Sequence, residues 1–281
     1  MAALDLDHLV INTRFDTLAA EDLFRQLGFT LTPRGHHAFG SVNHLMVFGN
    51  DYLELIGLPE EGTVLRQEIL DSPSGIDGLV FQARDADSVH TWLTERGLPI
   101  QPLHAFTRPV QIDGQTFDAS FRTVRFQPGY FPAGRVYFCQ HETPELIWRR
   151  TWQKHANQAR RLAGLAIVSG DPANDAEKYA DVAQGTAVRD SNGVYRIHGR
   201  QHALVVYSHE AYQARYGDLA CERRPAFFGA IGVGVESPVP LRAALQRLGS
   251  RVQYRLTPGR TTLRIPEFNT LLDFLHGDDD L

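Results

Sequence analysis

The sequence has very little cysteine. Only Cys139 and Cys221 occur among 281 residues, and they lie far apart in the chain. A disulfide framework needs several cysteines, and a structural zinc site needs closely spaced ones. Both are therefore excluded. We expect Cys139 to be a buried and unreactive thiol, because its strand neighbours offer no group that would acidify it.

Long apolar runs and clusters of basic residues are also missing. No stretch approaches the ~20 apolar residues that a membrane span requires. The N-terminal Met-Ala-Ala-Leu-Asp-Leu-Asp-His is acidic where a signal peptide is basic. The formal net charge is −5, and the basic residues around 149–150 and 160–161 form only a short, interrupted group. The sequence thus predicts a cytoplasmic protein that binds neither membrane nor nucleic acid.

What the sequence does contain is one order of elements, repeated four times: strand, helix, then three strands. Apolar alternation and helical periodicity carry this prediction, with glycine after each helix. The first strands are expected at 4–12, 78–83, 164–168 and 228–235. The helices are expected at 17–27, 86–96, 173–183 and 239–248. The remaining strands are expected at 29–32, 42–48, 52–56, 100–103, 121–126, 135–139, 186–189, 195–197, 203–207, 251–255, 261–265 and 271–275.

Each such unit is too small to bury both faces of its own sheet. Its helix covers one face, and the other face needs a second unit. We therefore predict an α+β protein of four βαβββ modules, paired into two curved-sheet domains, each around a cup. The first domain is expected at 1–150 and the second at 163–281, with 151–162 as the linker.

Two polar residues stand in apolar strands that should face the first cup. Strict alternation puts Leu6 and His8 on one face of the first strand and Leu9 on the other, helix-covered face. In the fourth strand the same alternation turns Glu54 toward the cup. A buried carboxylate must be paired, hydrogen-bonded or bound to a metal. His8 and Glu54 are thus candidate metal ligands, and a plain His–Glu hydrogen bond is an equally good interpretation.

Three motifs resemble one known family. They are Leu-Asp-His-Leu-Val-Ile at 6–11, Gly-Ser-Val-Asn-His-Leu-Met-Val-Phe at 40–48 and Tyr-Leu-Glu-Leu-Ile-Gly at 52–57. Together they resemble the glyoxalase-like domain of the vicinal oxygen chelate superfamily, which includes glyoxalase I and the extradiol dioxygenases. The resemblance covers residues 4–160 best. It implies paired βαβββ modules, with His8 and Glu54 at the positions of metal ligands.

The other modules depart from that pattern. Gly78 stands where His8 stands in the first module, and Gly164 and Ala230 take this place in the last two. The fourth strand of the second module offers Gln140 or His141, depending on a register slip of one residue. We therefore expect any chemistry in the first cup, with His141 as the third metal ligand.

Further residues are candidates for binding a substrate. His37, Asn43 and His44 follow the second strand and are expected to form a polar wall of the cup. Gln140 is a candidate there too. Arg122 and Arg125 point to opposite faces of their strand, so only one can reach the cup. We expect Arg122 to bind an anionic group, with a surface salt bridge as the alternative.

The resemblance and these residues together predict a metal-dependent enzyme of small-molecule metabolism. A divalent ion (Zn, Mn, Ni or Fe) would be held by His8, Glu54 and His141 and would chelate neighbouring oxygens of the substrate. A lyase or isomerase of the glyoxalase type is favoured over an extradiol-type dioxygenase. The alternative is a metal-free protein that binds or sequesters a small molecule. A homodimer is also possible.

Overall fold

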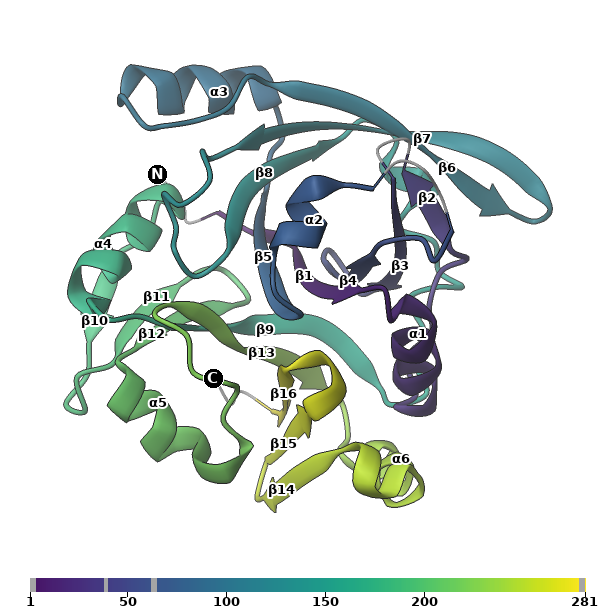
Figure 1. Cartoon of the computed structure of the whole chain (residues 1–281), viewed down its shortest axis with the longest axis vertical. Coiled ribbons are helices and arrows are strands. Elements are labelled where there is room, and N and C mark those ends of the chain that lie inside the picture. Colours follow the sequence, from purple (N-terminus) through teal and green to yellow (C-terminus); the bar gives the residue numbers. More distant parts are fainter. Residues whose placement is uncertain (1–3, 38–39, 62–64, 278–280) are drawn as a thin grey trace.

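Two curved eight-stranded sheets form the framework of the protein (Figure 1). The computed structural model describes residues 4–37, 40–61, 65–277 and 281. The first sheet consists of β1 (Leu6–Arg14), β2 (Gly35–His37), β3 (Ser41–Val47), β4 (Tyr52–Gly57), β5 (Gly75–Gln82), β6 (His104–Ile112), β7 (Gln115–Arg125) and β8 (Arg135–His141). The second consists of β9 (Ala159–Val168), β10 (Ala187–Arg189), β11 (Tyr195–His198), β12 (Ala203–Tyr207), β13 (Phe227–Val235), β14 (Gln253–Thr257), β15 (Arg260–Ile265) and β16 (Thr270–His276). The α-helices are α1 (Thr17–Gln26), α2 (Gln67–Asp71), α3 (Ala86–Glu95), α4 (Pro172–Val182), α5 (His209–Tyr216) and α6 (Val239–Leu248).

The strand orders are β2-β3-β4-β1-β5-β8-β7-β6 and β10-β11-β12-β9-β13-β16-β15-β14. In each sheet the first strands of two modules pair antiparallel at the centre, and each pairs parallel with the fourth strand of its own module. The prediction of an α+β fold with four modules in two pairs is confirmed.

Several details differ from the prediction. Residues 29–32 form no strand, because the Phe29 amide hydrogen-bonds to the Phe24 carbonyl and ends α1 instead of joining a ladder. Residues 100–103 precede β6, which begins only at His104. Helices α2 and α5 were not predicted. Strand β9 begins at Ala159, inside the segment expected to be a linker.

A β-bulge recurs at the same place in all four modules. At this place the central pairings skip one residue in each first strand, namely Asp7, Asp77, Ala163 and Gly229; β9 also skips Arg160 nearer its start. A bulge turns the extra residue out of strict alternation. In the first sheet both bulge residues are buried aspartates, whereas in the second they are small and apolar. The bulge also corrects the expected faces of β1: Leu6 packs with Leu9 and Ile11 in one apolar cluster instead of lying on the cup side with His8.

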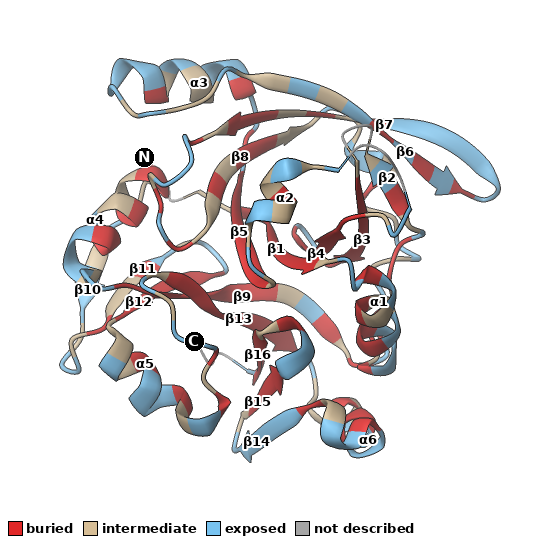
Figure 2. Cartoon of the chain, viewed as in Figure 1, coloured by how far each residue is buried: buried red, intermediate tan, exposed pale blue. Residues whose placement is uncertain are grey.

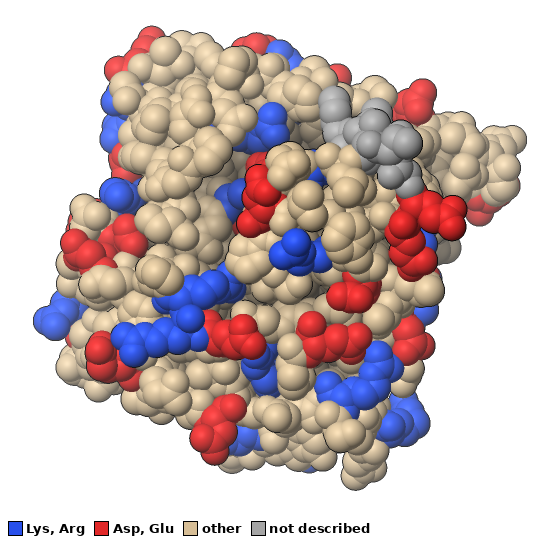
Figure 3. Space-filling view, in the orientation of Figure 1, with Lys and Arg blue, Asp and Glu red and all other residues tan. Residues whose placement is uncertain are grey.

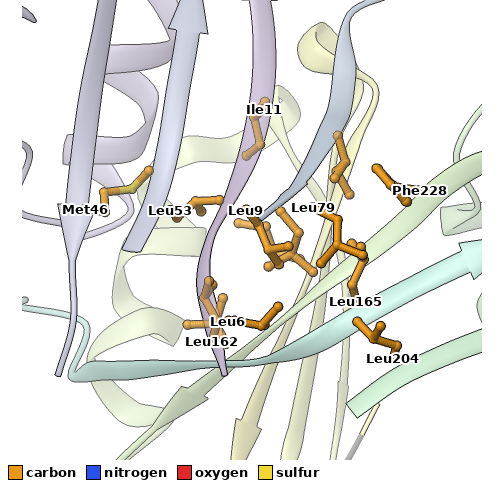
Figure 4. Packing of buried hydrophobic residues seen from close by; sticks show 14 of the residues in the cluster. Leu6, Leu9, Ile11, Met46, Leu53, Leu79, Leu162, Leu165, Leu204 and Phe228 are labelled. Carbon is orange, nitrogen blue, oxygen red and sulfur yellow. The ribbon is translucent and has the colours of Figure 1, made fainter. Parts of the chain in front are cut away.

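The two sheets share one hydrophobic core. Leu9 and Leu79 from the centre of the first sheet pack in the same cluster as Leu165 and Phe228 from the centre of the second (Figure 4). The sheets therefore meet through their central strands, β1 and β5 of the first and β9 and β13 of the second (Figure 1). Figure 2 shows this central region almost entirely buried, with exposed residues on the outer helix faces and on the β6–β7 hairpin.

The two cups differ in what fills them. On the second sheet, α5 lies against the concave side, and its Tyr212 and Tyr216 form an apolar cluster with Tyr207 and the C-terminal Leu281. A Cβ at Gly229, the bulge position, would come within 2.6 Å of the Tyr212 ring. The Tyr212 hydroxyl donates to the Gly229 carbonyl at 2.8 Å. Helix α5 thus fills the space that a polar bulge residue would need.

On the face seen in Figure 3, acidic and basic residues alternate without a large patch of one sign. Among the described residues, no helix has both the length and the apolar character needed to cross a membrane.

The shared core predicts that the two sheets unfold together. We expect Leu9→Ala to lower the free energy of unfolding by about 2–5 kcal/mol, because it leaves a cavity where the sheets meet. All three tryptophans lie between residues 92 and 152, so their fluorescence reports on the first half of the chain, whereas far-UV circular dichroism reports on both halves. The two urea transitions should coincide and shift together. Leu256→Ala, at a side chain 45% exposed, is the control and should shift neither. Separate transitions would contradict a single core.

A buried acid at the boundary between the sheets predicts a dependence on pH. Asp51 Oδ1 accepts a hydrogen bond from the Leu162 amide at 3.0 Å, and burial raises the pKa of this carboxyl to about 8. Between pH 4 and pH 8 the folded chain keeps this proton and the unfolded chain loses it, so this group costs stability as pH rises. Asp51→Asn keeps the acceptor and has no such proton. We expect the variant to gain stability over the wild type from pH 5 to pH 8, measured by urea denaturation. If the free energies of unfolding of variant and wild type differ by the same amount at pH 5 and at pH 8, this assignment is refuted.

Candidate functional site

A cavity of about 340 Å³ lies on the concave side of the first sheet. Strands from both modules line it, so pairing two modules creates a hollow that neither has alone. Its walls combine histidines, acids, arginines and aromatic rings. The lining side chains are those of His8, His37, Asn43, Leu45, Tyr52, Glu54, Ile56, Arg66, Glu68, His104, Phe106, Arg108, Phe121, Thr123, Arg125, Arg135, Tyr137 and Cys139.

His8 is fixed on both edges of its ring. Its Nδ1 lies 2.6 Å from Asp7 Oδ1, and its Nε2 lies 3.1 Å from the Tyr137 hydroxyl. Burial alone would raise the pKa of Asp7, but the neighbouring His141 and His8 lower it to about 2. The carboxylate can only accept, so His8 Nδ1 donates to it. In the neutral ring Nε2 then carries the lone pair, directed toward the cavity.

Glu54 approaches His8 from the neighbouring strand β4. Its Oε2 lies 3.7 Å from His8 Nε2, and its Oε1 accepts a hydrogen bond from Asn43 Nδ2 at 2.6 Å. Burial opposes ionisation, but His8, His37 and the Asn43 hydrogen bond hold the pKa of Glu54 below its ordinary value. Both predicted residues therefore face one hollow, and Glu54 is a carboxylate there.

Two tyrosines complete the surroundings of His8. The Tyr52 ring stacks on the imidazole at 4.3 Å between centroids. Burial raises the pKa of the Tyr137 phenol well above its ordinary value, so the hydroxyl stays protonated and donates to His8 Nε2. Tyr137 was not among the predicted residues. Alternation along β8 from His141 could have indicated it, once the register of that strand was known.

His141 does not join His8 and Glu54 around a single point. It faces inward, but its Nε2 lies 3.0 Å from Asp7 Oδ1, so Asp7 separates it from His8. The two nitrogens of the His8 ring point in opposite directions, one toward Asp7 and one toward Glu54. The expected trio of His8, Glu54 and His141 is thus not assembled, because the Asp7 bulge stands between two of its members.

His141 instead belongs to a buried group with Asp7 and Cys139. Their ligand atoms all lie within 4.8 Å of one another. In the described part of the chain, Asp7 Oδ2 and His141 Nδ1 have no hydrogen-bond partner. Burial raises the pKa of the Cys139 thiol well above its ordinary value, which agrees with the predicted unreactive thiol.

Of the expected polar wall, His37 and Asn43 line the cavity and His44 does not. Burial lowers the pKa of His37 to about 4, so its ring is neutral at pH 7. His44 lies on the other face of β3, where Nδ1 donates to the Thr32 carbonyl at 2.9 Å and Nε2 lies 3.1 Å from Glu21. Asn43 and His44 are consecutive residues of β3, so their side chains point to opposite faces of the sheet and only Asn43 reaches the cavity.

Gln140 and Arg122 are also placed outside the cup. Gln140 Oε1 accepts from the Ala86 amide at 2.7 Å, at the start of α3. Arg122 makes two hydrogen bonds to Asp87 on the same helix. The alternative of a surface salt bridge therefore describes Arg122, and Arg125 is the arginine of that strand that lines the cavity.

The cavity contains more positive than negative groups. Arg66, Arg125 and Arg135 lie around Glu68, with nitrogen–oxygen distances of 2.6, 3.8 and 3.6 Å. Arg135 also pairs with Asp77, the second bulge residue, at 2.6 Å. Apart from Arg125, the sequence analysis did not predict these residues. They come from the loop before α2, from α2 itself and from distant strands, and only the fold brings them together.

Comparisons with solved structures agree on the fold. The chain is similar to a hypothetical protein from Staphylococcus aureus, with a TM-score of 0.68 at 9% identity over 98% of this chain and 100% of that one. It is similar to a mutant of 4-hydroxymandelate synthase from Streptomyces coelicolor, with a TM-score of 0.56 at 13% identity, over 100% of this chain and 94% of that one. It also matches a fusion of a xylose isomerase-like TIM barrel and 4-hydroxyphenylpyruvate dioxygenase, with a TM-score of 0.58 at 11% identity, over 100% of this chain but 49% of that one. At such identities the likeness shows the fold alone.

The sequence itself gives a more direct assignment. No curated protein matches it significantly. The family model described as a glyoxalase-like domain matches residues 6–183, which include β1 to β9 and the whole lining of the cavity. Because this match covers more than half of the sequence, the chain belongs to the glyoxalase-like domain family, as its motifs predicted.

Proposed function

We propose that the protein is an enzyme of small-molecule metabolism that works in the first cup, with His8 and Glu54 holding a divalent metal ion. One observation carries the proposal. His8 Nε2 and Glu54 Oε2 face each other at 3.7 Å inside a buried cavity, which is too far for a hydrogen bond. Asp7 holds the other ring nitrogen of His8, and Asn43 holds the other carboxylate oxygen of Glu54.

The donor atoms fit such an ion. Two ligand atoms that each lie about 2.1 Å from one ion are roughly 3 to 3.6 Å apart at ordinary coordination angles. The measured separation is close to this range. The Asp7 contact to His8 Nδ1 is the carboxylate–histidine arrangement that commonly orients a metal-binding imidazole. Two protein ligands would leave positions for oxygens of a substrate.

When bound, a divalent ion would polarise a carbonyl or hydroxyl oxygen of the substrate as a Lewis acid. The remaining roles fall to side chains of the cavity. Asp7 keeps His8 in one tautomer and orientation. The protonated Tyr137 hydroxyl can donate a hydrogen bond to an oxygen that gains charge. The arginines around Glu68 favour anionic molecules over neutral ones.

The donor set favours a lyase or isomerase over an oxygenase. Oxygen activation by non-haem iron typically uses two histidines and one carboxylate on one face of the metal. Here the second histidine, His141, is turned to Asp7. The alternative reaction is that of an extradiol-type or related oxygenase, because one of the structural neighbours is named as a dioxygenase.

A metal-free binding protein is the second candidate, and one contact favours it. The Tyr137 hydroxyl lies 3.1 Å from His8 Nε2 and so occupies the lone pair that an ion would use. The cavity would then take up a small molecule without transforming it.

Metal analysis of protein purified without chelators separates these candidates. We expect about one equivalent of divalent metal in the wild type, and loss of at least ten-fold in affinity in His8→Ala and Glu54→Gln, because each removes one of two protein ligands. Glu236→Gln and His36→Ala, both outside the cavity, are matched controls and should bind as the wild type does. Retention of metal by both cavity variants, with loss in His141→Ala, would place the ion at Asp7, Cys139 and His141. Absence of metal in all of them would favour the binding protein.

The role given to Asp7 predicts a separate effect. Asp7→Asn keeps the size of the side chain but removes the negative charge that orients His8 and His141. We expect metal affinity to fall about 10- to 100-fold, measured by calorimetric titration with Zn²⁺ and Mn²⁺. Circular dichroism should confirm that the variant is folded. An unchanged affinity in folded protein would show that Asp7 does not orient the ligand.

A further inference from the structure

We infer that Arg108 binds the anionic oxygen group of the ligand, a carboxylate or a phosphate, and that the neighbouring aromatic wall takes a flat apolar body attached to it. This inference rests on the proposed function only in placing a small molecule in the first cup. It adds the chemical class of that molecule and the residue that selects it.

Among the described residues, Arg108 differs from the other arginines of the cavity in having no carboxylate partner. It lies on β6, is only 4% exposed and lines the cavity. Arg66, Arg125 and Arg135 all lie within 4 Å of a carboxylate oxygen. Within the described ranges, Arg108 makes no ion pair and no hydrogen bond. A guanidinium offers five N–H donors in a fixed plane, and here they are unused.

A buried cation without a partner is costly to the fold. Burial lowers the pKa of Arg108, and the nearby Glu54 offsets this only in part and without contact. Arginine nevertheless remains charged in proteins. An anion that enters the cavity would supply the missing hydrogen bonds, and a guanidinium fits carboxylate and phosphate in a two-point geometry.

The backbone makes room for this side chain at Gly35. A Cβ at this position would come within 2.5 Å of Arg108 Nη1 and would also collide with Asn43 Oδ1. A larger residue could not allow Arg108 to pass so close to β2. Asn43 Oδ1 is buried and, among the described residues, has no hydrogen-bond partner. Arg108 and Asn43 therefore leave unsatisfied donors and an unsatisfied acceptor beside the same glycine.

An aromatic wall continues from the guanidinium. Arg108 lies over the Phe121 ring at 5.8 Å. Phe121 stacks with Phe106 at 5.2 Å, and Phe106 stacks with His104 at 5.4 Å. All four side chains line the cavity. A flat ring or planar chain can lie along this wall while its anionic end meets Arg108.

The size of the cavity sets the scale of the ligand. Its volume of about 340 Å³ lies near the lower end of the range of small-molecule sites, about 300–1,000 Å³. An arylalkyl carboxylate or an aryl phosphate is small enough for this space. We therefore choose phenylacetate and phenyl phosphate as probes, with the neutral phenylacetamide as the isosteric control.

The experiment compares Arg108→Met with Arg122→Met, which removes an arginine that the structure places outside the cup. Binding of the three probes is measured by calorimetry, and unfolding of the ligand-free proteins by thermal denaturation. We expect the wild type and Arg122→Met to bind an anionic probe and to discriminate against phenylacetamide. Arg108→Met should lose roughly 10- to 100-fold of that affinity. A preference for phenylacetate or for phenyl phosphate identifies which oxyanion the site takes.

Ligand-free stability gives an independent result. A structural arginine stabilises the fold, so its removal lowers the midpoint of unfolding. A buried binding arginine without a carboxylate partner destabilises the ligand-free fold. We therefore expect the midpoint of thermal unfolding of Arg108→Met to equal or exceed that of the wild type. A lowered midpoint, or failure of the wild type to bind either anion, overturns the inference. Metal affinity of Arg108→Met, measured alongside, should equal that of the wild type, so failure of this inference is distinguished from failure of the metal site.

Discussion

The site depends on one buried carboxylate. Asp7 accepts from His8 on one side and from His141 on the other, and these two contacts hold it ionised in spite of complete burial. In an interior of low polarity an unpaired carboxylate would take up a proton, and His8 would lose the partner that fixes its tautomer. The orientation of His8, its distance to Glu54 and the contact of His141 with Asp7 in place of the His8–Glu54 pair all follow from the position of Asp7.

A backbone irregularity produces that position. The same bulge occurs in all four modules, so the fold supplies four equivalent places where an extra residue leaves the alternation. In the first sheet Asp7 and Asp77 occupy two of them, and each binds one residue of β8 in the second module, His141 or Arg135. In the second sheet the places hold Ala163 and Gly229, and α5 fills the concave side with tyrosine rings. One architecture therefore yields a polar hollow in one pair of modules and, in the other, a cup filled by the tyrosine rings of α5.

Charge in the first cup is distributed unevenly. Around Glu68 and Asp77 the arginines are paired and hold α2 and β8 against the cavity. At Arg108 the positive charge is left open beside an aromatic wall. Tight pairing stabilises structure, whereas an open charge in a buried hollow is useful only when a ligand completes it. In the function proposed above, His8 and Glu54 would supply the chemistry and Arg108 the recognition of the ligand.

The sequence alone determined the order of elements, the pairing of modules and the inward direction of His8 and Glu54. These follow from local rules: helical and strand periodicity, glycine after helices, and alternation along β4. Only the tertiary structure decided the rest. Alternation along β1 fails at Asp7, because a bulge depends on pairing with β5 and cannot be read from one strand. Whether Gln140 or His141, or Arg122 or Arg125, faces inward depends on register with neighbouring strands. Arg108 became a candidate for ligand binding only when its burial, its lack of a carboxylate partner and the rings beside it were known together. Each of these is a property of contacts between distant segments.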